Sequence, residues 1–320
     1  MRATAIAQPN IALIKYWGKR DSTRNLPAVG SISITLRDLF TKMSVQLDAE
    51  LASDVLYVND ERDDGMLPRI SACLDEVIGR GRMRARVDSV CNFPIAAGLA
   101  SSASAFAATT LAAAGAADLN LDTRRLASLA GRASGSAARS LYGGFVELAN
   151  NGDDIAMTVL CDADSWPLSV VVAVTESVPK AVGSSEAMEI SRKTSPFYAN
   201  WVERQPEDLD VARNAILERD FKQLAIIAEH NCLKMHSVMW ASRPPPMFWN
   251  AATMACLQTV RKLQGDGCSV FFTIDAGPQV KAVCLPGDAE TVHAALAATP
   301  GVTEVLVSAL GAAARLVDPR

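Results

Sequence analysis

Residues 94–104 read Pro-Ile-Ala-Ala-Gly-Leu-Ala-Ser-Ser-Ala-Ser, and this stretch is the most informative part of the chain. It follows an alternating segment, residues 83–91, that predicts a strand, and it opens an Ala-rich segment, residues 102–116, that predicts a helix. A glycine turn with hydroxyls at a helix start can bind phosphate, because free backbone N–H groups and the positive end of the helix dipole meet there. No lysine follows the glycine with P-loop spacing, so a cation for the phosphate must come from elsewhere.

The composition indicates a globular protein large enough for two domains. The chain has 320 residues, of which 49% are hydrophobic and 21% charged. The net charge of −4 argues against nucleic acid as the main partner. Seven cysteines without C-x-x-C spacing favour reduced thiols, and the N-terminal residues lack the apolar run of a signal peptide. We therefore expect a cytoplasmic protein that binds neither nucleic acid nor membranes.

The predicted secondary structure changes from mainly strands to longer helices past the middle of the chain. Alternating, β-branched segments recur up to residue 174, and longer helical patterns follow from residue 184. Within the helical part, Pro206 is predicted to separate a helix over residues 196–203 from one over residues 206–219. This mixture predicts an α+β fold with two domains, residues 1–180 and 181–320, and a site in the cleft between them.

A second cluster, residues 10–20, reads NIALIKYWGKR. Its first part predicts an edge strand, and Tyr16, Lys19 and Arg20 then gather at a glycine turn. Lysine and arginine side chains there suit an anionic ligand. Solvated charges at a strand end have the same pattern, so in isolation both interpretations stay open.

A third cluster, residues 131–144, places Arg139 one turn inside a short predicted helix that Ser134 and Ser136 open. An arginine at that place can bind a carboxylate or a phosphate that the helix start also attracts. An arginine on an ordinary surface helix is the plainer interpretation.

A fourth cluster ends an apolar strand at Asp275, just before Ala-Gly-Pro. A carboxylate at a strand end, kept ionised by a nearby cation, suits a general base, although an aspartate that caps a turn has the same pattern. The histidines show no metal-ligand spacing: His230 and His236 are six residues apart and His293 stands alone, so we interpret them as structural.

Taken in order, the four clusters resemble the GHMP kinase superfamily, and within it the diphosphomevalonate decarboxylase family. The segments that carry the resemblance are NIALIKYWGK (10–19), NFPIAAGLASS (92–102), SGSAARSLYGGFV (134–146) and TIDAGP (273–278). One such segment would be weak evidence, whereas four in the same order, spread over most of the chain, are strong.

The resemblance implies a GHMP kinase-like fold, with an N-terminal domain of the ribosomal protein S5 domain 2-like type, a ferredoxin-like C-terminal domain and the active site between them. It implies ATP-dependent conversion of mevalonate 5-diphosphate to isopentenyl diphosphate in the mevalonate route to isoprenoids. The C3 hydroxyl is phosphorylated first, and phosphate and CO₂ then leave. ATP is the co-substrate, Mg²⁺ is expected to bind through its phosphates with no protein ligand assigned, and a homodimer is expected.

The resemblance also implies roles for residues at matching positions. Asp275 would orient or deprotonate the C3 hydroxyl, Arg139 would hold the substrate carboxylate, and Asn10 and Lys19 complete the expected catalytic set. The expected substrate contacts are Tyr16, Lys19, Ser134, Ser136, Arg139 and Ser185. The expected ATP contacts are Pro94, Gly98, Leu99, Ala100, Ser101, Ser102 and Ser104.

The chain departs from the family pattern at three places. Residues 29–31 are Val-Gly-Ser where Asn-Ser-Ser is common, and Ala138 stands where a cysteine is usual. Glu186 follows Ser184-Ser185 where some bacterial members have arginine, and it would add negative charge near a diphosphate. Three alternatives therefore stay open: a decarboxylase of mevalonate 5-phosphate, a mevalonate 3-kinase, and a catalytically silent nucleotide-binding homologue.

Overall fold

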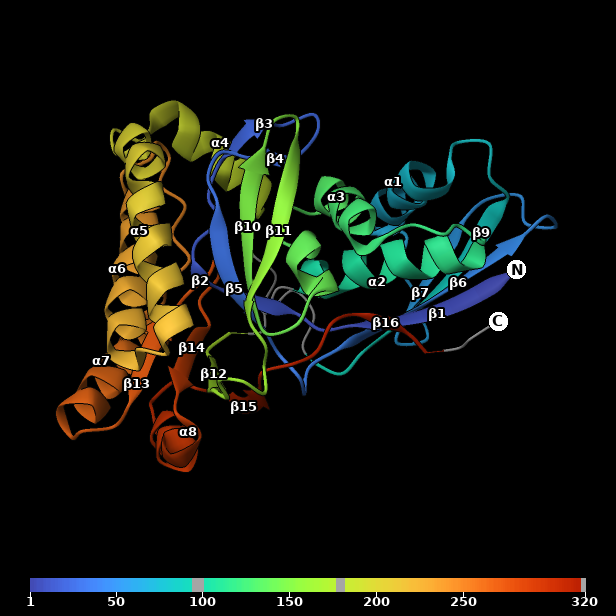
Figure 1. Ribbon diagram of the computed structural model, residues 1–320. Coiled ribbons are helices and arrows are strands. Elements are labelled where there is room, and N and C mark those ends of the chain that lie inside the picture. Colours follow the sequence, from blue (N-terminus) through green and yellow to red (C-terminus); the bar gives the residue numbers. More distant parts are fainter. Residues whose placement is uncertain (94–100, 177–181, 318–320) are drawn as a thin grey trace.

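The structure is a computed structural model that describes residues 1–93, 101–176 and 182–317 (Figure 1). A six-stranded sheet with its helices forms one side of the molecule, helices of the C-terminal half stack on the other, and a four-stranded sheet lies between them. Of the predicted phosphate-loop residues, Pro94, Gly98, Leu99 and Ala100 lie outside the described ranges.

The first sheet builds the N-terminal half. Its strands, in spatial order, are β16 (Arg315–Leu316), β1 (Arg2–Ala7), β6 (Thr41–Asp48), β9 (Arg84–Cys91), β7 (Val55–Val58) and β8 (Glu61–Arg62). Helix α2 (Ser101–Ala116) packs on β1 and β6. Its small side chains let it approach closely: a Cβ atom at Gly115 would lie 3.0 Å from the Cβ atom of Ala3. The Ala-rich segment is thus a core helix that brings its first turn to a fixed place.

Two further sheets and a short ribbon complete the strands. The second sheet runs β11 (Asp154–Cys161), β10 (Phe145–Asn151), β5 (Ser31–Thr35), β2 (Asn10–Ile14), with β2 at its edge as predicted. The third runs β13 (Val270–Thr273), β14 (Val280–Cys284), β12 (Ser169–Val174), β15 (Glu304–Ala309). The ribbon pairs β3 (Lys19–Asp21) with β4 (Leu26–Pro27).

The remaining helices cover the sheets. They are α1 (Leu67–Ile78), α3 (Thr123–Ala133), the 3₁₀ helix η1 (Ala137–Leu141), α4 (Ser184–Thr194), α5 (Tyr198–Glu218), α6 (Phe221–Trp240), α7 (Ala251–Gly265), the 3₁₀ helix η2 (Pro286–Asp288) and α8 (Ala289–Ala297). Helix α1 lies where no element was predicted. Its buried side chains, Ile70, Cys73, Leu74 and Val77, have the i, i+3, i+4, i+7 spacing that could have identified it.

Helix α5 corrects the prediction that Pro206 separates two helices. The helix is continuous from Tyr198 to Glu218, with Pro206 inside it. A proline removes one backbone hydrogen bond of a helix. Here Trp201, Gln205 and Leu209 are buried on either side of it, and tertiary packing of this face maintains the helix across the proline.

The domain boundary predicted near residue 180 stays a prediction. Strand β12 precedes that residue and pairs with β14 and β15 of the third sheet. Strand β16 follows it and pairs with β1 of the first sheet. Judged by hydrogen bonding, the chain therefore enters the C-terminal sheet before Ser169 and returns to the N-terminal sheet at Arg315.

Two amide side chains fasten the end of β2 to the long helices. The backbone N–H of Lys15 donates to Asn231 Oδ1 at 2.8 Å, and the Lys15 carbonyl accepts from Gln205 Nε2 at 2.9 Å. Asn231 Nδ2 also donates to Gln205 Oε1 at 2.9 Å. Since β2 is an edge strand, these bonds satisfy backbone groups that a neighbouring strand would otherwise satisfy.

We expect the Asn231→Leu variant to lose about 2–4 kcal/mol of unfolding free energy, because it leaves the Lys15 N–H and the Gln205 amide buried without this partner. Chemical denaturation of the purified variant measures the loss. Asn200→Leu, at an exposed position on α5, is the matched control and should change stability by less than about 0.5 kcal/mol. Equal stability of the two variants would contradict the role given to Asn231.

Candidate active site

A cavity of about 720 Å³ opens between the two halves of the molecule. The N-terminal half contributes residues from β2, the turn after it, the ribbon, α1, the start of α2, the end of α3 and η1. The C-terminal half contributes residues from α4, Met235 of α6 and Asp275, which follows β13. Residues from all four sequence clusters line it, among them Asn10, Tyr16, Lys19, Ser101, Ser102, Ser134, Ser136, Arg139 and Asp275.

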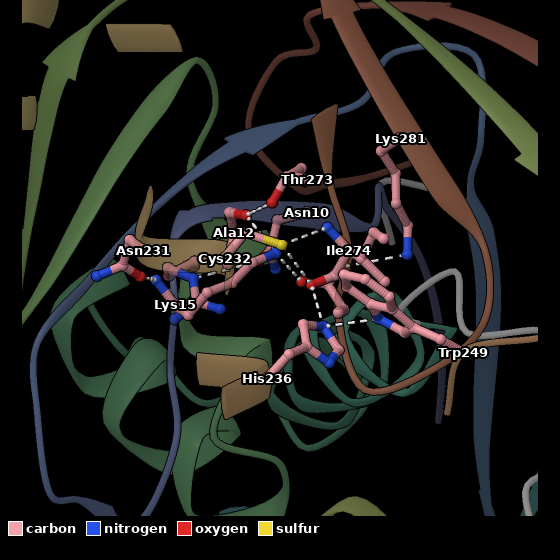
Figure 2. Close-up of polar contacts among 12 residues, drawn as sticks. Asn10, Ala12, Lys15, Asn231, Cys232, His236, Trp249, Thr273, Ile274 and Lys281 are labelled. Atoms are coloured by element: carbon pink, nitrogen blue, oxygen red, sulfur yellow. Dashed lines mark hydrogen bonds and ion pairs between the residues drawn. The ribbon is translucent and has the colours of Figure 1, made fainter. Parts of the chain in front are cut away.

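The chemistry of the cavity centres on Asp275. Lys15 Nζ donates to Asp275 Oδ1 at 2.7 Å, and Lys281 Nζ lies 3.4 Å from Oδ2. The Lys15 side chain is 1% exposed, that of Lys281 0%, and that of Asp275 26%. Thr273 Oγ1 and Lys15 Nζ both donate to the Ala12 carbonyl, at 3.1 Å and 2.9 Å, and so join β13 to β2 (Figure 2). The carboxylate is thus held between two lysines at the floor of a cavity.

These contacts determine the charge of the site. Burial by itself would raise the pKa of Asp275, but Lys15 and Lys281 outweigh that effect and hold the pKa well below its usual range. Asp275 is therefore an anion at any physiological pH. Asp275 Oδ2 is buried next to Lys281, but the side chain as a whole is partly exposed and lines the cavity, so the carboxylate can accept a hydrogen bond from a hydroxyl there.

Arg139 provides a fixed cation in the same cavity. Its side chain is buried, Nε donates to Asn10 Oδ1 at 3.2 Å, and Nη1 donates to Ser31 Oγ at 2.5 Å. Asn10 in turn donates from Nδ2 to the Ser136 carbonyl at 2.9 Å and to Ser140 Oγ at 2.8 Å. Burial lowers the pKa of Arg139 to about 10, which leaves the guanidinium charged at neutral pH. Asn10 therefore orients the arginine.

Tyr16 adds a polar atom that has no hydrogen-bond partner within the described part of the chain. The residue lines the cavity, and its buried hydroxyl makes no hydrogen bond with the described residues. Burial raises the pKa of Tyr16 to about 12, so the phenol stays protonated and can donate. A Cβ atom at Gly135 would collide with this hydroxyl, which explains why a residue without a side chain stands between the two serines of the third cluster.

One end of the cavity gathers cations. Lys19 Nζ donates to Ser185 Oγ at 2.9 Å and so connects the ribbon to α4. Burial, together with the nearby charge of Arg69, lowers the pKa of Lys19. Arg69 and Arg132 line the same cavity, and Arg132 also pairs with Glu76 at 2.6 Å. Such an end suits a ligand with several negative charges.

The start of α2 only partly matches the predicted phosphate site. Ser101 and Ser102 line the cavity at the first turn of the helix, where backbone N–H groups are free to bind an anion. Ser104, however, is fully buried: its hydroxyl lies 2.7 Å from Thr41 Oγ1 and donates to the Ser101 carbonyl at 3.2 Å. It does not line the cavity, and it holds the helix on the sheet instead.

The positions of some charged residues differ from those expected from the sequence. Lys15 lies in the second cluster, but the sequence assigns it no role, and the motifs do not include Lys281 or Arg69. Arg20 points elsewhere, donating to the Gly152 carbonyl at 2.5 Å and to Asn150 Oδ1 at 3.2 Å. Glu186 is exposed and does not line the cavity, so its charge stays away from the cationic end.

His236 is a buried residue that contacts the backbone next to Asp275, in agreement with the interpretation of the histidines as structural. It is fully buried, and its Nε2 atom lies 3.2 Å from the Ile274 carbonyl and 3.3 Å from Trp249 Nε1 (Figure 2). Burial lowers the pKa of His236 to about 3. The ring is therefore neutral, and it packs against the residue that precedes Asp275.

The described residues can also be searched for membrane-spanning helices and for groups of metal ligands. Within residues 1–93, 101–176 and 182–317, no helix combines the length and apolar character needed to cross a membrane. Nor do these residues contain a group of three or more His, Cys, Asp or Glu side chains that could hold a metal ion.

The architecture and the interdomain cavity define the class first: this is a two-domain α+β protein with a GHMP kinase-like fold. Two family models then cover most of the chain. A diphosphomevalonate decarboxylase-like N-terminal domain matches residues 7–159, and a mevalonate 5-diphosphate decarboxylase C-terminal domain matches residues 170–309. The chain therefore belongs to the diphosphomevalonate decarboxylase family, as the sequence motifs indicated.

Individual relatives agree with the family. The diphosphomevalonate decarboxylase of Homo sapiens is 35% identical, over 86% of this chain and 74% of the human protein. That of Candida albicans is 33% identical, over 86% of this chain and 82% of its own length. The crystal structure of mevalonate diphosphate decarboxylase from Staphylococcus aureus superimposes with a TM-score of 0.93, at 33% identity and over 99% of this chain and 98% of that one.

A structure with ligands is also similar. MDDEF in complex with MVAPP, AMPPCP and magnesium superimposes with a TM-score of 0.92, at 31% identity, over 100% of this chain and 99% of that one. The similarity extends over both halves of the chain and hence over both walls of the cavity.

The neutral, buried His236 predicts a loss of stability in acid. In the unfolded chain this histidine binds a proton near pH 6.5 and in the folded protein only near pH 3, so its contribution is complete above pH 6.5 and is lost as the pH falls toward 3. We expect the unfolding free energy of the wild type to fall, relative to that of His236→Gln, by about 1.4 kcal/mol per pH unit between pH 6 and 4. Denaturation curves at several pH values measure this.

The exposed His230, on the same helix, supplies the control. His230→Gln should follow the wild type at every pH. Parallel stability curves for His236→Gln and the wild type would show that His236 titrates normally.

Proposed function

We propose that this protein catalyses the ATP-dependent decarboxylation of mevalonate 5-diphosphate, releasing isopentenyl diphosphate, ADP, phosphate and CO₂. The proposal is supported by the family assignment and by one observation above all. An ionised, partly exposed Asp275 lies in the same cavity as the buried cation Arg139. Phosphoryl transfer to a hydroxyl needs a carboxylate such as Asp275 to orient that hydroxyl. Decarboxylation needs a cation such as Arg139 to hold the substrate carboxylate.

In the phosphoryl-transfer step, Asp275 would accept a hydrogen bond from the C3 hydroxyl and so direct its oxygen at the γ-phosphorus of ATP. The new C3–O–P bond forms as the bond to ADP breaks. Because Lys15 and Lys281 keep Asp275 strongly ionised, it is a weak base. Its main contribution is therefore orientation, and the hydroxyl proton passes late to the Asp275 carboxylate, as a loose phosphoryl transition state allows.

In the elimination step, the C3–O bond breaks with departure of phosphate, and the C1–C2 bond electrons form the C2–C3 double bond as CO₂ leaves. Arg139 would bind the C1 carboxylate and fix its orientation until the bond breaks. Lys15, which lines the cavity next to Asp275, lies where it can stabilise the charge of the departing phosphate.

The described residues fit ATP and the substrate diphosphate. Ser101 and Ser102 offer hydroxyls and a helix N-terminus for nucleotide phosphates. The unpartnered Tyr16 hydroxyl, Lys19 and Arg69 offer donors for a second polyphosphate group. Mg²⁺, when bound through the phosphates, would neutralise part of their charge.

Three features of the protein stay part of this proposal: an N-terminal domain up to residue 180 followed by a C-terminal domain, a homodimeric state, and a cytoplasmic location. Size-exclusion chromatography with light scattering tests the second. The third is supported by the free cysteines among the described residues.

The first test incubates the protein with ATP, Mg²⁺ and, separately, mevalonate, its 5-phosphate or its 5-diphosphate, and measures ADP and CO₂. We expect equal ADP and CO₂ with the diphosphate and little of either in the other tubes. Equal amounts of ADP and CO₂ with the 5-phosphate would change the assigned substrate to mevalonate 5-phosphate. ADP without CO₂ would indicate a 3-kinase. The absence of both products in every tube would indicate a catalytically silent homologue.

Asp275→Asn should lower kcat by about 10²–10⁴-fold and leave KM for the diphosphate within a few-fold, because it removes orientation of the hydroxyl and not the anion-binding groups. Steady-state kinetics measures both constants. Glu186→Gln, outside the cavity, is the control and should behave as the wild type. Turnover that persists in Asp275→Asn would contradict the assignment.

Arg69→Met should raise KM for the diphosphate by about 10–100-fold with a smaller effect on kcat, because it removes a charged donor from the cationic end. Arg20→Met is the matched control, since Arg20 contacts the backbone of Gly152 instead of the cavity. A KM that is the same in both variants would exclude Arg69 from the substrate site.

A further inference from the structure

We propose that Lys281 is a positioning residue for Asp275: it holds the Oδ2 side of the carboxylate from outside the cavity and keeps the group ionised and in place while ligands occupy the cavity. The inference rests on the proposed function of Asp275. It adds a residue that the sequence motifs do not single out.

The position of Lys281 is unusual for a lysine. It lies on the second strand of the C-terminal sheet, opposite Thr273 of β13 on one side and Val172 of β12 on the other. Its side chain is 0% exposed. A buried ammonium costs several kcal/mol unless it is paired, and one partner of the Lys281 ammonium is the carboxylate of Asp275, just beyond the end of β13.

The two lysines hold Asp275 from different sides. Lys15, at the end of β2, contacts Oδ1 at 2.7 Å and lines the cavity. Lys281, on β14, lies 3.4 Å from Oδ2 and does not line the cavity. Figure 2 shows the Lys281 side chain reaching this cluster from the side opposite Lys15.

This difference separates their roles. A phosphate group in the cavity competes with Asp275 for the ammonium of Lys15, because both are anions within its reach. Lys281 lies behind the carboxylate and keeps its contact. As negative charge enters the cavity, Lys281 is therefore the cation in contact with Asp275 that continues to oppose its protonation.

Several titratable or charged groups face Asp275 from the surrounding elements. They are Lys15 after β2, Lys281 on β14, Arg139 on η1, and Cys232 and His236 on α6. Burial raises the pKa of the Cys232 thiol and lowers that of the His236 ring, so both are neutral near pH 7. Among the described residues, the positive groups are thus the two lysines and the arginine, and removal of Lys281 alone leaves the other two in place.

The test compares pH–rate profiles of Lys281→Met and the wild type with ATP, Mg²⁺ and mevalonate 5-diphosphate. With ligand phosphates in the cavity, the acid limb of kcat reports protonation of Asp275 in the complex, and we expect this limb to move up by about one pH unit or more in the variant, since burial of Asp275 is then less fully opposed. Below that limb kcat should fall about 10-fold per pH unit, and at pH 8.5 it should recover to within about 3-fold of the wild type. KM for the diphosphate should change by less than about 3-fold.

Two matched variants sharpen the comparison. Lys42→Met removes an exposed lysine from a strand of the first sheet and should leave the profile unchanged. In an Asp275→Asn background, Lys281→Met should lower the residual rate no further, because a residue that acts through Asp275 has no effect once Asp275 is gone. An added loss of more than about 3-fold in the double variant would overturn the inference.

The remaining outcomes also decide. A uniform loss of activity at all pH values, with no shift of the acid limb, would overturn the inference by assigning Lys281 a purely structural role. If Lys281→Met does not fold, Lys281→Gln carries the same test without the charge, and failure of both to fold would count against the inference. A wild type that makes no CO₂ from the diphosphate would instead refute the proposed function, so the two failures are distinct.

Discussion

The ion pair between Lys15 and Asp275 is the contact on which the cavity depends. Its partners are 260 residues apart in the chain and come from the two halves of the molecule. Both side chains are largely removed from water, so removal of either leaves an uncompensated charge at the point where the halves meet. The nearby Ala12 carbonyl accepts bonds from both Lys15 and Thr273. The same few atoms therefore join the strands and present the carboxylate to the cavity.

Strand β2 connects this pair to the rest of the site. Asn10 begins the strand and orients Arg139, and Lys15 follows its last residue and holds Asp275. Helices α5 and α6 fix the far end of the strand through the amides that bind the Lys15 backbone. Arg139, proposed to bind the C1 carboxylate, and Asp275, proposed to bind the C3 hydroxyl, are thus both positioned by one rigid strand. An edge strand, fastened by side chains instead of a neighbouring strand, contacts Arg139 of one half and Asp275 of the other through residues at its two ends.

Much of the site could be predicted from the sequence, because its motifs are contiguous. The segments around Tyr16, Arg139 and Asp275 each contain their own turn or helix start, and the cavity brings all three together as expected. Lys281 could not be found in this way. It stands alone in an apolar strand, and its relation to Asp275 arises from strand pairing across a hairpin. The prediction at Pro206 was wrong for a related reason. The local preference of proline predicts the end of a helix, whereas burial of the surrounding helix face outweighs the lost backbone hydrogen bond.

The pairing of β16 with β1 has a consequence for how the chain is made. The first sheet begins with residues 2–7 and is completed at its edge by residues 315 and 316. Leu316 also packs near α2, where a Cβ atom at Gly115 would lie 3.2 Å from it. During synthesis the N-terminal half emerges from the ribosome first, yet one edge of its sheet stays open until residues 315 and 316 have been added. The newborn chain must therefore keep that exposed edge from pairing with other chains throughout translation of its C-terminal half.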